Sequence, residues 1–178
     1  MLDNILSGVM KPGRYIGGEW NASKKDFYAS NIKFALCFPD LYEIGMSNLG
    51  IRILYGILNG IPDVSCERFF SPAKDMEDNL RNNKAEIFSL ESKKPLKDFD
   101  LVGFSLGHEL GYTNVLNILD LGGVPLRASK RSADFPLVIG GGPCTLNPEP
   151  MHEFFDFFVI GEAEEAIVEI VNLYRGLK

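Results

Sequence analysis

One pattern constrains the fold of this chain more than any other: a short apolar run followed by a helix with one apolar face. The runs 33–38, 101–106 and 157–160 show too little polar alternation for half-exposed strands, so we interpret them as buried parallel strands. After each run, apolar residues recur at i, i+3, i+4 and i+7, the spacing of an amphipathic helix. Alternation of this kind gives right-handed β-α-β units. We therefore predict an α/β fold, a doubly wound, flavodoxin-like (Rossmann-like) parallel sheet with helices on both faces.

Weaker signals complete the predicted sheet. Residues 64–70 and 136–139 are further predicted strands, and 124–127 is a predicted short strand. We predict a helix over 73–82, because Ser71-Pro72 joins an N-cap residue to a proline at the first helical position.

The first 31 residues differ from the rest. They show little periodicity and contain Pro12-Gly13 and Gly17-Gly18, so we expect an irregular N-terminal arm, residues 1–31, packed on an α/β domain of residues 32–178. The large apolar side chains of Tyr15, Ile16 and Trp20 would gain from docking on the core.

Composition narrows the class of protein. A chain of 178 residues with 46% apolar residues suits one domain, and a net charge of −6 argues against nucleic-acid binding by a broad basic surface. No apolar run approaches the roughly 20 residues that a membrane helix needs, and the start lacks the shape of a signal peptide. We therefore expect a cytoplasmic protein without a membrane partner. Its three cysteines, widely spaced, are interpreted as reduced thiols.

Four turns, each directly after a predicted strand, carry the candidate site. Because parallel strands end at one edge of a sheet, and ligands bind outside that edge, we expect these turns to form one ligand face. Glycines there allow a ligand to approach the backbone, although a tight turn would also explain them. The two histidines, His108 and His152, lie far apart in the sequence and lack the spacing of metal ligands, so we expect no metal site. The candidate binding residues are Asp40, Tyr42, Glu43, Gly45, Ser105, Leu106, Gly107, His108, Gly140, Gly141, Gly142, Pro143, Gly161, Glu162 and Glu164.

Two other functions stay open at this point. Gly103 to Gly107 matches the G-x-S-x-G nucleophile elbow, which would make Ser105 the nucleophile of a serine hydrolase, with Asp134 and His152 following in the required order. The acidic surface and the arm would also suit a non-catalytic interaction module.

The ordered turns resemble a known family. Asp40 to Gly45, then Phe104-Ser105-Leu106, then Gly140 to Pro143, then Gly161-Glu162 with Glu164, together resemble the N-terminal cobalamin (B12)-binding-like domain of radical SAM proteins. The resemblance places the D-x-H-x-x-G loop of that family on Asp40, Tyr42 and Gly45. Tyr42 then stands where a histidine would ligate cobalt. The resemblance implies either cobalamin bound without a protein ligand to cobalt, or a retained fold that caps an adjacent active site.

The same resemblance implies what this chain does not carry. The three cysteines lack the C-x-x-x-C-x-x-C spacing of a radical SAM cluster. We therefore expect the iron-sulfur cluster and S-adenosylmethionine to belong to a C-terminal radical SAM domain of a longer protein. That domain, and a small-molecule cofactor or substrate, are the implied partners, and residues 1–178 alone are not expected to be catalytic.

Overall fold

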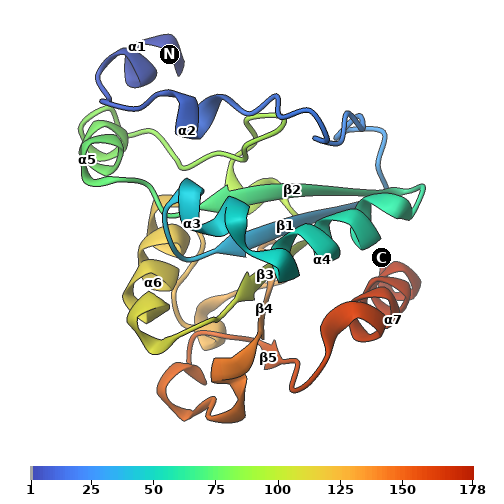
Figure 1. Cartoon of the computed structure of the whole chain (residues 1–178). Helices are drawn as coiled ribbons and strands as arrows, with labels where there is room; N and C mark the ends of the chain where they lie inside the picture. Colours follow the sequence, from blue (N-terminus) through green and yellow to red (C-terminus); the bar gives the residue numbers. More distant parts are fainter. Residues whose placement is uncertain (1) are drawn as a thin grey trace.

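A computed structural model describes residues 2–178 and shows one five-stranded, all-parallel sheet (Figure 1). The strand order is β2-β1-β3-β4-β5, with helices on both faces, so the predicted flavodoxin-like α/β fold is confirmed. The strands are β1 Ile32–Phe38, β2 Val64–Phe70, β3 Leu101–Ser105, β4 Leu137–Gly141 and β5 Phe157–Phe158.

Two helices cover each face of the sheet. Helix α4 (Leu49–Gly60) and helix α7 (Ala163–Leu177) pack on one face, where alternate residues of β1 such as Phe34 and Leu36 point. Helix α5 (Lys74–Asn82) and helix α6 (Tyr112–Leu121) pack on the other face. The strands are apolar on both sides for this reason, as their uninterrupted apolar runs predicted.

Local signals set the helix ends. The side chain of Asn48 accepts a hydrogen bond from the Ile51 amide at 3.0 Å, so Asn48 is the N-cap of α4. Helix α6 ends at Gly122, and the following Gly123 has a positive φ of 67°. Within residues 2–178 the helices are too short or too polar to cross a lipid bilayer.

The arm lies over the edge formed by β2 and α5 and contains two short helices, α1 (Leu2–Ser7) and α2 (Gly13–Ile16). The prediction of an arm without regular structure was therefore wrong in part. Tyr15 docks as expected and accepts a hydrogen bond from the Ala73 amide at 3.0 Å. Trp20 does not dock: its side chain is 99% exposed.

Four further expectations need correction. Residues 42–47 form a short helix, α3 (Tyr42–Ser47), where we expected a loop, because Gly45 packs this turn directly on Phe70. Residues 124–127 contain no strand, and β5 has two residues where four were expected. Helix α5 begins after Ala73, so Ser71 does not cap it. The short 3-10 helices are Leu96–Asp98, Glu109–Gly111, Ala128–Lys130, Pro143–Leu146 and Glu149–Met151.

Candidate functional site

The carboxyl ends of the strands form one rim, which we define as Asp40, Ser71, residues 105–111 and residues 141–146. The chain leaves β1 and β3 toward opposite faces of the sheet, so the topological switch point lies between these two strands. Ligands of doubly wound folds bind at this kind of position. The rim is continuous, since the Leu106 amide donates to the Gly141 carbonyl at 2.7 Å and the Ser71 amide donates to the Asp40 carbonyl at 2.9 Å.

Asp40 and His108 face each other across the switch point. His108 Nε2 lies 3.9 Å from Asp40 Oδ2, and the other carboxylate oxygen, Oδ1, accepts a hydrogen bond from the Leu41 amide. The His108 side chain is 53% exposed, so a neighbouring molecule can reach it. Asn114, which sequence reasoning missed, donates to the Pro39 carbonyl at 2.9 Å and fixes the start of α6 beside this pair.

A buried hydroxyl next to this pair has no partner. Among the described residues, Ser71 Oγ is buried without a hydrogen-bond partner. An unsatisfied buried polar group costs about 1–3 kcal/mol. A buried water molecule bonded to it would recover that free energy.

The predicted glycines divide into two groups. A Cβ at Gly140 would lie 2.6 Å from the Phe158 ring, and one at Gly142 would lie 2.9 Å from the Leu106 carbonyl oxygen, with φ at 99°. Internal packing and backbone conformation therefore explain these two glycines. Gly107 and Gly161 have open space at the Cβ position, and Gly141 has one backbone atom at 4.0 Å. Gly161 has a φ of 108°, so its backbone conformation also explains this glycine, and Gly107 and Gly141 are the two that leave room for a ligand.

Tyr42 and Glu43 contact the arm. The Tyr42 hydroxyl donates to Glu19 Oε1 at 2.8 Å, and burial together with the Glu19 carboxylate raises the pKa of Tyr42 to about 12. Arg14 Nη2 lies 2.9 Å from Glu43 Oε1, and the hydrogen bond from Arg14 lowers the pKa of Glu43. The side chains of Tyr42 and Glu43 therefore hold the arm in place.

The remaining predicted residues are spread along the rim and beyond it. Ser105 is half-buried at the end of β3, Leu106 is buried, and Pro143 is exposed at the start of a 3-10 helix. Glu162 and Glu164 are exposed at the start of α7, where the helix dipole favours carboxylates. Their assignment to a ligand stays a prediction.

Sequence reasoning missed a buried ion-pair network on β2. Arg68, 5% exposed, has its Nε 2.6 Å from Glu91 Oε1 and its Nη2 2.8 Å from Glu19 Oε2. Its guanidinium carbon lies 4.5 Å from the Tyr55 ring centroid, and Tyr55 Oη accepts a hydrogen bond from the Ser23 amide. The signal was available, because Glu67-Arg68 interrupts an apolar strand and buried charges require partners.

The geometry argues against a serine hydrolase. In a nucleophile elbow, the amide after the serine helps to bind the oxyanion, but the Leu106 amide here is bonded to Gly141. Asp134 lies three residues before the start of β4, whereas Ser105 is at the carboxyl end of β3, so the two residues lie at opposite edges of the sheet. His152 Nδ1 is 2.7 Å from the Glu149 carbonyl oxygen and contacts neither residue.

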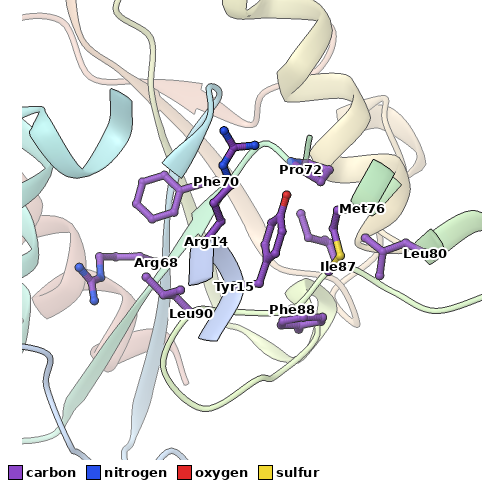
Figure 2. Close-up of a pocket in the computed structure, with 10 residues that line it drawn as sticks. All are labelled: Arg14, Tyr15, Arg68, Phe70, Pro72, Met76, Leu80, Ile87, Phe88 and Leu90. Atoms are coloured by element: carbon purple, nitrogen blue, oxygen red, sulfur yellow. The ribbon is translucent and has the colours of Figure 1, made fainter. Parts of the chain in front are cut away.

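A small cavity lies under the arm, between α2 and α5 (Figure 2). Its volume is about 20 Å³, which is room for one water molecule. Figure 2 shows Tyr15 reaching into it between Phe88 and Pro72, beside Met76. This cavity is a packing gap where the arm meets the core, and it is too small for a cofactor.

The three cysteines are free thiols, two of them buried and one half-buried. Cys37 and Cys66 are 0% and 1% exposed on neighbouring strands, and burial raises the pKa of both. Cys144 is half-buried on the rim. Across residues 2–178, no three His, Cys, Asp or Glu side chains are grouped as a metal site would require.

Fold and rim together define a flavodoxin-like α/β domain with its candidate contact surface at the switch point of the sheet. Comparison with protein families gives a match to the model described as radical SAM proteins, N-terminal, over residues 50–178. The chain belongs to this family. The match begins after β1, so Asp40 to Gly45 lie outside the matched residues.

One relative extends the comparison. The chain is 27% identical over 141 residues to the uncharacterized protein MJ0966 of Methanocaldococcus jannaschii. The alignment covers 78% of this chain and 26% of that protein, so the chain spans about a quarter of the length of its relative.

Proposed function

We propose that this domain serves as an accessory domain of a radical SAM enzyme and that its rim caps the active site of the catalytic domain. The observation that carries the proposal is the Asp40–His108 pair at the switch point, in which the imidazole is exposed and the carboxylate is half-buried. The family match supports the catalytic partner, since it is a family of N-terminal domains of radical SAM proteins. The iron-sulfur cluster and S-adenosylmethionine would belong to that partner.

Tyr42 does not fit the role of a protein ligand to cobalt. Tyr42 occupies the position expected for such a ligand, but its hydroxyl is bonded to Glu19 and its ring stacks edge-on against Phe70 at 5.6 Å. Its pKa, raised to about 12, moves formation of the phenolate, the form that would bind a metal, still further from neutral pH. We therefore propose capping as the main role. A corrin, if one binds, would be held by the polar groups of the rim alone.

Hydrogen exchange tests the capping proposal. The 178-residue chain is compared alone and as the N-terminal part of an intact radical SAM protein. We expect added protection at residues 105–111 and 141–146, and none at residues 132–137, which lie at the opposite edge. Protection at the opposite edge, or at neither edge, would contradict the proposal.

The two histidines offer a matched pair of variants. His108→Glu replaces an imidazole whose Nε2 lies 3.9 Å from Asp40 Oδ2 with a second carboxylate, and this should weaken the protection. His152→Glu, outside the rim, should not. Separately, the chain is titrated with hydroxocobalamin and its visible spectrum is recorded. A spectral change that Asp40→Asn removes would show that the rim binds a corrin and that a pure cap is the wrong description.

A further inference from the structure

Helix α4 has a second apolar face that the core does not use. Its inner residues, Ile51 and Tyr55, are buried against the sheet. On the outer side, Leu49 is 66% exposed and Ile53 is 38% exposed, and Gly56 continues the same row at helical spacing. A helix that is apolar on two sides is typically covered on both. This outer face is therefore a candidate contact surface.

The arm faces this side of α4, and Trp20 lies at the margin of the space between them. Between residues 19–22 and α4 lies an open cleft of about 540 Å³, within the size range of binding pockets. We call it the arm cleft. Trp20 points into solvent at its margin, and tryptophan is among the residues that most often anchor protein interfaces. A partner that covers Trp20 and Ile53 would remove two large apolar side chains from water.

The polar groups of the arm cleft indicate the chemistry of the occupant. No carboxylate among residues 2–178 pairs with Arg52, the single charged residue of α4. Arg68 Nη1, at the base, has only the thioether of Met46 as a partner at 3.0 Å, and sulfur is a weak acceptor. Arg52 can therefore take a carboxylate and Arg68 Nη1 a neutral oxygen.

The charge around Arg68 separates these two roles. Glu19 and Glu91 already neutralise Arg68, so a second anion at its Nη1 would be repelled, whereas a peptide carbonyl would not. Arg52 has no such neighbours and favours an anionic partner. An apolar anchor, a backbone carbonyl and a carboxylate are together the groups of a short peptide segment.

We propose that the arm cleft is the docking site for a peptide segment of a partner protein. The segment places an apolar side chain between Trp20 and Ile53 and an Asp or Glu carboxylate on Arg52. This surface contains none of the rim residues Asp40, Ser105 and His108, so the proposal is independent of the capping function.

A display library of random dodecapeptides, selected on the 178-residue chain, tests the proposal. Enriched peptides should share an apolar residue and an Asp or Glu. Trp20 is the single tryptophan of the chain, so its fluorescence reports binding directly, with a blue shift when the indole leaves water. Hydrogen exchange of the wild-type chain should show the footprint of an enriched peptide on residues 19–22 and 49–56.

Variants give the quantitative test. Trp20→Ala and Arg52→Glu should each weaken binding of an enriched peptide about tenfold or more, as measured by isothermal titration calorimetry. Arg52→Lys should keep most of the affinity, and selection on Arg52→Glu should enrich Lys or Arg in place of the acid. Leu173→Lys, on an exposed position of α7, is the matched control for Ile53→Lys and should leave binding unchanged.

Three results would overturn the proposal. The first is no enrichment of peptides. The second is a set of enriched peptides that lack a shared Asp or Glu, or whose binding does not depend on Trp20 and Arg52. The third is concentration-dependent dimerisation in sedimentation that Ile53→Lys abolishes, since it would make a second copy of this chain the occupant.

Discussion

Gly45→Ala separates a packing role of this glycine from a ligand role. An alanine Cβ at position 45 would lie 2.2 Å from Phe70 Cε1 and 3.2 Å from Phe38 Cδ1. Ordinary carbon contacts are about 3.5–4.0 Å, so the Phe70 ring would have to retreat by roughly 1 Å or more. The ring is buried and packs on Tyr42, so it cannot move without disturbing the Tyr42–Glu19 hydrogen bond.

The expected loss of stability follows from two opposing effects. Overpacking a core costs about 1–3 kcal/mol, while alanine gains about 1 kcal/mol over glycine inside a helix. Because two Phe70 ring atoms would lie at 2.2 and 2.4 Å, the overpacking cost should fall in the upper part of its range, about 2–3 kcal/mol. The net destabilisation should then be about 1–2 kcal/mol, which lowers the melting temperature by about 2–8 °C for a chain of this size. Differential scanning calorimetry and urea unfolding of the ligand-free chain measure it.

Gly56→Ala is the matched control. Gly56 also lies within a helix, but a Cβ there would meet nothing within 4 Å, so this substitution should stabilise the chain by about 0.5–1 kcal/mol. In a Phe70→Leu background, the cost of Gly45→Ala should fall toward zero, because the clashing atoms are removed. If Gly45→Ala stabilises the ligand-free chain as Gly56→Ala does, packing is not the reason for this glycine.

Three other predictions concern the rim, the arm and a turn. Gly142→Ala should cost about 2–4 kcal/mol in urea unfolding, because φ is 99° and the new Cβ would lie 2.9 Å from the Leu106 carbonyl oxygen; a neutral effect would show that the turn can rearrange. Burial alone would raise the pKa of Glu19, but its hydrogen bonds and the charge of Arg68 outweigh burial and lower it. The contribution of Glu19 to stability should therefore be fully present above its unfolded pKa of about 4.3 and should be lost as pH falls through its lower folded pKa. The difference in stability between wild type and Glu19→Gln should then shrink on acidification. A constant difference from pH 7 to pH 2 would contradict the pairing of Glu19 with Arg68. Lys84→Gly should stabilise the chain by about 0.5–1 kcal/mol, since Lys84 has φ at 51°; thermal unfolding measures it, and a loss of stability would mean that the lysine makes a contact worth more than the strain.

Regular elements could be predicted because their signals are local. The apolar runs of β1 and β3 and the helical spacing in α4, α6 and α7 lie within short windows of sequence. Burial on both faces of the sheet follows from those runs alone. The two-residue strand β5 and the single-turn helix α3 have no comparable signal, because their extent depends on neighbours far along the chain.

The site could be predicted only as far as topology determines it. Parallel pairing brings the ends of β1, β3 and β4 to one edge, so the meeting of these turns could be predicted. The direction of Tyr42 could not, because its partner Glu19 is brought close by an arm that has no periodicity. Trp20 was expected to dock because it is large and apolar, but Tyr15, Glu19 and Ser23 already anchor the arm and leave the indole in water.

The contact between Gly45 and two phenylalanine rings affects how this loop can change over evolutionary time. Exchange of a cobalt-binding imidazole for a phenol at position 42 would leave Phe38 and Phe70 in place, and both would still exclude any side chain at position 45. Packing alone can therefore preserve the glycine of this loop, whichever residue stands at position 42. A partial motif of this kind is evidence of folding requirements before it is evidence of present-day chemistry.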